Sequence, residues 1–171
     1  MDHSASLKPR IGVSACLTGL AVRYDGQSRY HPLVSEQLAG QFQLVPFCPE
    51  VAIGLGVPRP PIQIVEIAGR RRVRGVIDPA QDVTDALRSL VDHLPADLAG
   101  FILKARSPSC GLGSAPVMRD GVQIDTDDGA FAAALRQRFP AMPLIDEEQV
   151  QQMEHCRAFI AAVHAWQAAR R

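Results

Sequence analysis

Apolar runs alternate with amphipathic stretches along most of the chain, and this alternation predicts strands that alternate with helices. Strands are expected where a short apolar run, or an alternation of apolar and polar positions, ends at a turn residue. Such segments lie at 10–16, 42–50, 62–67, 69–76, 100–105 and 142–146. Helices are expected where apolar residues recur at helical spacing. These segments lie at 32–40, from Asp82 or Thr84 to Leu94, at 127–139 and at 147–171.

Strands that alternate with helices are typical of a mainly parallel sheet covered by helices on both faces. We therefore predict the α/β class, as a three-layer sandwich around a Rossmann-like sheet, with a small β-hairpin formed by 62–67 and 69–76. The 171 residues have the length of one domain, and no repeat, low-complexity tract or linker divides them. A single domain over residues 1–171 is expected, with 1–9 as a disordered tail.

Three of the four cysteines follow predicted strands. Cys16, Cys48 and Cys110 each stand at the carboxyl end of a strand, in a loop that contains proline or glycine. Parallel sheets bind ligands in the crevice beyond the carboxyl ends of their strands, so these thiols are candidates for one shared site. Free cysteines are also among the most buried residue types, so ordinary core packing is the alternative. Cys156 lies within the predicted terminal helix and is expected to be a core residue.

The charge balance argues against a polyanionic partner. Eighteen basic and eighteen acidic residues cancel, so no net field attracts nucleic acid or an anionic membrane. No apolar run approaches the roughly 20 residues that span a bilayer, and the first ten residues lack the apolar core of a signal peptide. We expect a cytoplasmic protein with reduced thiols, without a stable nucleic-acid complex or membrane association, as a monomer or small homo-oligomer.

The spacing of the cysteines limits what they could hold. A structural zinc site usually takes four ligands, often in close pairs, and the chain has no such pair. A disulfide would leave one thiol over, and the five histidines stand in no recognisable nucleophile motif. A 4Fe-4S cluster bound by three cysteines would leave one iron without a protein ligand. That iron is a soft Lewis acid, suited to catalysis on a sulfur-bearing substrate.

Four separated motifs resemble those of the thiouracil desulfurase (TudS-like) family. They are "VSACLTGLAVRYDG" (13–26), "CPEVAIGLGVPRPPIQI" (48–64), "DVT" (82–84) and "LKARSPSCG" (103–111). Their order and spacing fit the family, and they are spread through the first two thirds of the chain. The chain resembles the short, single-domain form.

The resemblance implies a function and a set of site residues. It implies a 4Fe-4S cluster on Cys16, Cys48 and Cys110, with Glu50 and Ser107 in the active site. The implied reaction is the non-redox removal of sulfur from thiouracil, or from a thiouridine derivative, to give uracil (or the uridine counterpart) and sulfide. The implied partner is a small thiopyrimidine base, nucleoside or nucleotide.

Each of the two candidate catalytic residues also has a purely structural interpretation. Glu50 is two residues from a cluster ligand, close enough to act as a general base on water or as an acid on the ring. It would otherwise cap the following segment. Ser107 could orient the substrate, or its hydroxyl could simply stabilise a turn.

Further candidates for substrate binding are Arg23, Tyr24, Arg59 and Ser109. Tyr24 could stack on a pyrimidine, and either arginine could bind a phosphate or a base oxygen. The alternative is a turn at Asp25 and Gly26, with an arginine that anchors an irregular loop.

Two other classes of protein stay open at this stage. One is an iron–sulfur redox-sensing or binding module without turnover. The other is a nucleotide-binding α/β domain whose cysteines are incidental, although the chain has neither a G-x-G-x-x-G after a strand nor a P-loop.

Overall fold

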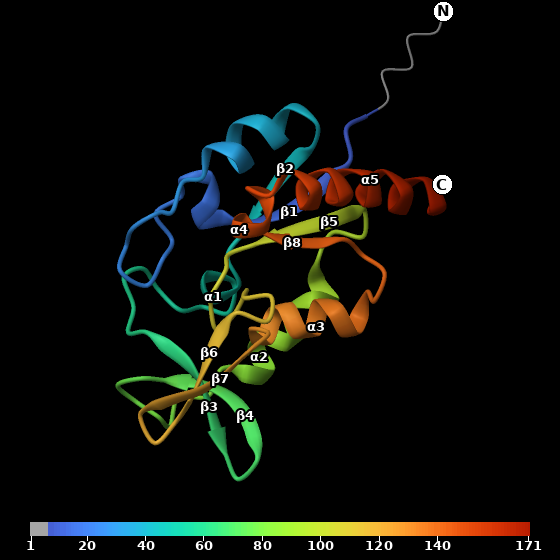
Figure 1. Ribbon diagram of the computed structural model, residues 1–171. Helices are drawn as coiled ribbons and strands as arrows, with labels where there is room; N and C mark the ends of the chain where they lie inside the picture. Colours follow the sequence, from blue (N-terminus) through green and yellow to red (C-terminus); the bar gives the residue numbers. More distant parts are fainter. Residues whose placement is uncertain (1–6) are drawn as a thin grey trace, which may run out of the picture.

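A parallel four-stranded sheet carries the candidate site in the computed structural model, which describes residues 7–171 (Figure 1). Its strand order is β2-β1-β5-β8, and every neighbouring pair is parallel. The strands are β1 (Arg10–Ser14), β2 (Gln43–Phe47), β5 (Leu98–Leu103) and β8 (Leu144–Asp146). Every residue of β5 is buried, which explains its uninterrupted apolar sequence, because a sheet covered on both faces has no polar side.

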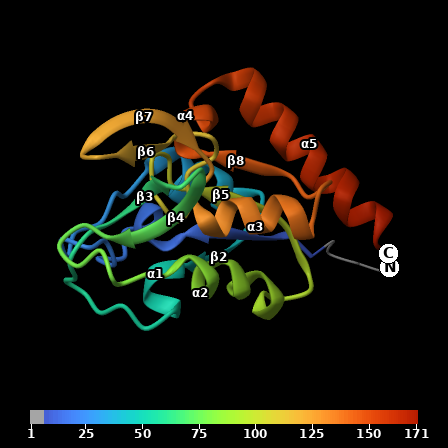
Figure 2. The same cartoon turned by 90° about the horizontal axis from the view of Figure 1, so that it is seen from below.

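Helices cover both faces of this sheet (Figure 1, Figure 2). One face packs against α5 (Met153–Ala169) and the helical turns Leu33–Gln37 and Leu38–Gly40. The other packs against α3 (Ala130–Arg138) and the helical turn Leu90–His93 that continues α2 (Thr84–Ser89). Phe42 and Phe159 belong to the first apolar cluster, and Phe101 and Phe131 belong to the second. The predicted α/β class with a parallel sheet is confirmed.

A second four-stranded sheet, of order β4-β3-β6-β7, lies beside the first (Figure 1). Its strands are β3 (Ile62–Ile67), β4 (Arg70–Gly75), β6 (Ala115–Arg119) and β7 (Val122–Asp127). The β3–β4 hairpin was predicted, but the antiparallel β6–β7 hairpin was not, so the second sheet is larger than expected. The cause is exposure: β7 is an edge strand with almost every residue exposed, so it carries no apolar alternation.

Several helix boundaries differ from the predicted ones. The expected helix at 127–139 begins only at Ala130, because Asp127 pairs with Ala115 in the sheet. The expected terminal helix is divided into α4 (Glu147–Val150) and α5, and Asp146 caps α4 through a capping box with Gln149. A short helix, α1 (Pro49–Ala52), follows β2 and was not predicted.

The predicted helix at 82–94 consists of α2 and the turn that follows it. Asp82, one of the two proposed caps, accepts a hydrogen bond from the Thr84 N–H at 3.0 Å. The Thr84 hydroxyl instead accepts from Val73 N–H in β4 at 2.7 Å.

The N-terminal tail predicted at 1–9 lies mainly outside the described residues, which begin at Leu7, and β1 starts at Arg10. Within residues 7–171, no helix has the length and apolar composition needed to cross a membrane.

Candidate active site

A cavity of about 320 Å³ opens at the carboxyl ends of the parallel strands, and Cys16, Cys48 and Cys110 all line it. Cys16 lies in the helical turn that follows β1, and Cys48 directly follows β2. Cys110 lies in the loop after β5. The structure therefore brings the three thiols to one site, as expected of a parallel sheet. The volume is in the range of small-molecule sites in proteins.

Burial works against ionisation of these thiols. Cys16 is 8% exposed and Cys110 is 4% exposed, and burial raises the pKa of both. The positive charges of Arg23 and Lys104 partly oppose the rise in the pKa of Cys16, and a hydrogen bond from Ser14 partly opposes it for Cys110. A thiolate here needs a strong positive partner, which a bound metal centre supplies.

The donor set of three cysteines suits an iron–sulfur centre, because such clusters are held by Cys thiolates. None of the four cysteines is in a disulfide. Among residues 7–171, no three His, Cys, Asp or Glu side chains are arranged to hold a single metal ion. Three thiols from three separate loops around one cavity fit a multi-iron cluster, in which different irons take different cysteines.

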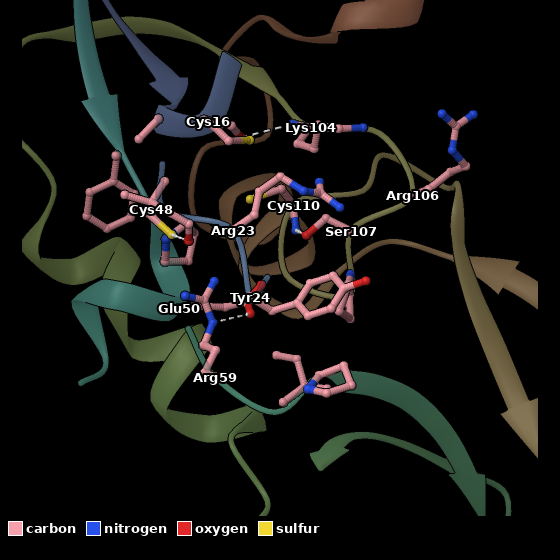
Figure 3. Close-up of a pocket in the computed structure, with 18 residues that line it drawn as sticks. Cys16, Arg23, Tyr24, Cys48, Glu50, Arg59, Lys104, Arg106, Ser107 and Cys110 are labelled. Atoms are coloured by element: carbon pink, nitrogen blue, oxygen red, sulfur yellow. Dashed lines mark hydrogen bonds and ion pairs between the residues drawn. The ribbon is translucent and has the colours of Figure 1, made fainter. Parts of the chain in front are cut away.

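Glu50 lines the same cavity from the first turn of α1 (Figure 3). Its Oε1 accepts a hydrogen bond from Arg59 Nε at 3.1 Å, and its Oε2 accepts one from Ser109 Oγ at 3.0 Å. The Glu50 side chain is 15% exposed and that of Arg59 is 6% exposed. The two donors fix the carboxylate at the cavity wall, and it makes no cap to α1.

The two serines beside Cys110 have different positions. Ser107 lines the cavity, and its Oγ accepts hydrogen bonds from the backbone N–H groups of Ser109 at 3.2 Å and Cys110 at 3.1 Å. Ser107 thus stabilises the turn and also borders the cavity. Ser109 was expected to bind substrate, but it is completely buried and is not part of the cavity wall. Its hydroxyl donates to Glu50, so it lies behind the carboxylate.

Arg23, Tyr24 and Arg59, the remaining predicted residues, all line the cavity. The side chain of Arg59 is bound to Glu50, and its Nη1 donates to the Gly56 carbonyl at 3.0 Å. Tyr24 is 42% exposed. Asp25 accepts a hydrogen bond from Gln27 N–H at 3.0 Å, as expected of a turn at this position.

The sequence analysis missed a buried ion pair at the cavity. Lys104 lines the cavity, and its Nζ lies 2.6 Å from Glu147 Oε1. Glu147 Oε2 also accepts the Ala105 N–H at 2.7 Å. Lys104 directly follows β5 and precedes the Cys110 loop, and this position in the sequence could have identified it as a site residue. Nothing in the sequence near Glu147 points to this site, because the pairing joins residues 43 positions apart.

Comparison with known proteins identifies the family. The model of the 2-thiouracil desulfurase family matches residues 11–148, a range that includes every cavity residue named above and Glu147. This chain belongs to the 2-thiouracil desulfurase family. The chain is also similar to the uncharacterized protein YbbK of Bacillus subtilis (strain 168), with 31% identity over 134 residues, 73% of this chain and 88% of that protein.

A solved structure supports the same assignment. The fold is similar to that of the 4Fe-4S-dependent thiouracil desulfidase TudS, with a TM-score of 0.63 and 32% identity. The match covers 88% of this chain and 99% of that one. The predictions of the family, of a desulfurase-type enzyme and of a 4Fe-4S cofactor agree with these comparisons. The family description also indicates a small thiopyrimidine as the substrate class.

Proposed function

We propose that this protein removes sulfur from thiouracil, or from a thiouridine derivative, and releases sulfide together with uracil or the uridine counterpart. One water supplies the oxygen that replaces the sulfur, and its two protons leave with the sulfide, so the reaction needs neither oxidant nor reductant. The proposal rests on one observation above all: three thiols from three loops line a single cavity together with Glu50 and Ser107.

Cys16, Cys48 and Cys110 would hold the 4Fe-4S cluster. When bound, the cluster supplies a soft Lewis acid, with one iron free of protein ligands, that suits a thiocarbonyl sulfur. Burial raises the pKa of Cys16, and the positive charges of the neighbouring Arg23 and Lys104 partly oppose that rise, which helps the thiolate form.

Glu50 acts as the general base in this proposal. Each carboxylate oxygen can accept two hydrogen bonds, so the bonds from Arg59 and Ser109 leave capacity on both oxygens. A water in the cavity donates to this free capacity and loses its proton to Glu50 as it adds to the ring carbon. The carboxyl group then returns the proton as the sulfur departs. Arg59 and Ser109 are positioning residues, since they set the direction of the carboxylate.

Ser107 orients the substrate. Its oxygen is occupied by two backbone N–H donors, so its own hydroxyl proton is left to donate into the cavity. A hydroxyl held in this way can bind an acceptor atom of the ring without rearrangement.

A cytoplasmic location, the absence of a stable nucleic-acid complex and a monomeric or small homo-oligomeric state belong to the same proposal. Sulfide release measured with the thiolated base, nucleoside and monophosphate in parallel compares the three forms of substrate.

The test begins with anaerobic reconstitution of the protein with iron and sulfide. A visible spectrum and iron analysis report the cluster, and a sulfide assay with 2-thiouracil and 4-thiouracil reports turnover. Cys110→Ser should prevent cluster assembly. Cys156→Ser is the matched control, because Cys156 lies in α5 and does not line the cavity, and it should leave both readouts unchanged.

Glu50→Gln separates catalysis from assembly. General acid–base assistance is worth about 10²–10⁴ in rate, so this variant should keep the cluster and lose turnover by about that factor. Near-normal turnover in a cluster-loaded Glu50→Gln variant would falsify the role of Glu50. A cluster without sulfide release from any thiopyrimidine would instead favour a redox-sensing or binding module. A colourless reconstituted protein would favour a nucleotide-binding domain with incidental cysteines.

A further inference from the structure

Arg23 and Arg59, two of the three arginines that line the cavity, differ in what their side chains already bind. Arg59 is almost fully buried, and it donates to Glu50 and to the Gly56 carbonyl. Arg23 Nε is also buried, but it has no hydrogen-bond partner among residues 7–171. The closest acidic oxygen to it, Asp25 Oδ1, lies 3.9 Å away, too far for a hydrogen bond. Arg59 is thus held by two protein acceptors, whereas the Arg23 side chain makes no hydrogen bond among residues 7–171 and keeps its donors for a ligand.

The backbone holds Arg23 in place. Its N–H donates to the Gln27 carbonyl at 3.1 Å, and its carbonyl accepts from Gly26 N–H at 2.9 Å. Gly26 has φ +75°, a conformation that favours glycine and closes this turn. The turn is joined to the next cavity segment, because the Arg59 N–H donates to the Tyr24 carbonyl at 2.8 Å. Figure 3 shows the Arg23 guanidinium reaching into the middle of the pocket, among the residues that line it.

We propose that Arg23 binds the oxygen that the thiopyrimidine ring carries beside its thiocarbonyl group, and so makes the site selective for rings with one sulfur and one oxygen. This inference rests on the proposed function. A guanidinium has N–H donors only, and the Arg23 guanidinium reaches into the cavity with no hydrogen bond to residues 7–171 (Figure 3). A ring carbonyl oxygen accepts from its Nη groups, whereas a second sulfur is a weaker acceptor and satisfies them poorly.

Tyr24 supports a planar ligand at this position. Its ring centroid lies 5.8 Å from Arg23 Cζ, and the half-exposed ring forms part of the cavity wall. An aromatic face beside a hydrogen-bonding fork matches a flat heterocycle with an oxygen at its edge. The pair Arg23 and Tyr24 thus binds the edge of the ring that carries the oxygen.

Uracil binding tests the inference without any turnover. The dissociation constant of uracil is measured by anaerobic calorimetry on the cluster-loaded protein. Arg23→Gln should weaken binding about 10–100-fold, because a hydrogen bond to a charged donor is lost. Arg23→Lys keeps the positive charge but lacks the planar guanidinium, so its dissociation constant for uracil should lie between those of the wild type and Arg23→Gln. Arg106→Gln is the control: Arg106 also borders the cavity but pairs with Glu148 and is 63% exposed, so it should change binding less than about fivefold.

A comparison of substrates tests whether Arg23 recognises the ring oxygen. KM is measured for 2,4-dithiouracil and for whichever monothiouracil the wild type turns over. The wild type should show a KM about tenfold or more higher for the dithio compound, and Arg23→Gln should remove most of this difference. Equal weakening of both compounds by Arg23→Gln would overturn the inference. An unchanged uracil affinity in Arg23→Gln, together with an altered cluster absorbance or reduction potential, would also overturn it. Arg23 would then act on the Cys16 thiolate and not on the substrate.

The two hypotheses fail in different ways. A wild-type protein that binds uracil but releases no sulfide contradicts the proposed function and leaves the Arg23 test intact. A wild-type protein that releases sulfide but whose uracil affinity does not depend on Arg23, or that does not bind uracil at all, contradicts this inference alone.

Discussion

The ion pair between Lys104 and Glu147 is one of two strongly buried pairs at the cavity, and removing one partner should be costly. The two side chains are only 13% and 8% exposed. Lys104→Met keeps the length and apolar stem of the side chain but removes the ammonium group. The Glu147 carboxylate then stays buried with the Ala105 N–H as its remaining donor. An unpaired charge in such a position is strongly destabilising.

The expected loss can be bounded from general measurements. Breaking a buried pair from one side costs about 3–5 kcal/mol, and the surviving bond from Ala105 favours the lower end, about 3 kcal/mol. That loss is a large part of the free energy of unfolding of a typical domain, which is roughly 5–15 kcal/mol. For a chain of this length it lowers Tm by about 6–12 °C. Urea denaturation followed by circular dichroism, on the metal-free and the cluster-loaded protein, measures the loss.

A neighbouring exposed pair provides the control. Arg106 and Glu148 join the same loop to the same helix α4, but they are 63% and 48% exposed. Arg106→Met should therefore cost only about 0.2–1 kcal/mol. The double variant Lys104→Met with Glu147→Gln should recover part of the loss, because no buried charge is left and the amide oxygen can still accept from the backbone. The reasoning is refuted if Lys104→Met costs no more than Arg106→Met, or if the double variant recovers nothing.

Two further predictions concern packing and pH. A Cβ on Gly129 would lie 2.6 Å from the Ser109 carbonyl oxygen and 2.7 Å from Cys110 N, so Gly129→Ala should cost about 1–3 kcal/mol in thermal or urea unfolding and lower the iron content after reconstitution. Asp82→Asn should be less stable than the wild type at pH 7. Burial tends to raise the pKa of Asp82, but hydrogen bonds, chiefly from Arg72, outweigh it and leave that pKa below its ordinary value.

Each of these predictions has its own control. A Cβ on Gly40 would meet no atom of the described residues within 4 Å, so Gly40→Ala should be close to neutral; equal losses at both glycines would contradict the packing argument. For Asp82, the carboxylate stabilises the fold above its unfolded pKa of about 3.9, and this stabilisation is lost as the pH falls through the lowered folded value. The stability difference from Asp82→Asn should therefore shrink in acid, and a difference that stays constant from pH 7 to pH 2 would contradict the assignment.

Segments with strong local patterns were predicted well. The strand β5 is apolar without interruption because both faces of its sheet are covered, and that pattern is visible in the sequence. The rule that parallel strands end at one edge then placed Cys16, Cys48 and Cys110 together. The hairpin β6–β7 was missed for the opposite reason, since an exposed edge strand needs no apolar pattern.

The contacts that orient the side chains could not be read from the chain, because they join positions far apart. Ser109 and Glu50 are 59 residues apart, and only the folded chain shows that the serine lies behind the carboxylate instead of facing the cavity. The same holds for the two arginines, which have equivalent chemistry in the sequence. Folding gives Arg59 a hydrogen-bonded carboxylate, whereas Arg23 Nε has no hydrogen-bond partner among residues 7–171 and only Asp25 at 3.9 Å. Local patterning reports which segments are buried, whereas hydrogen-bond partners depend on what packs across from them.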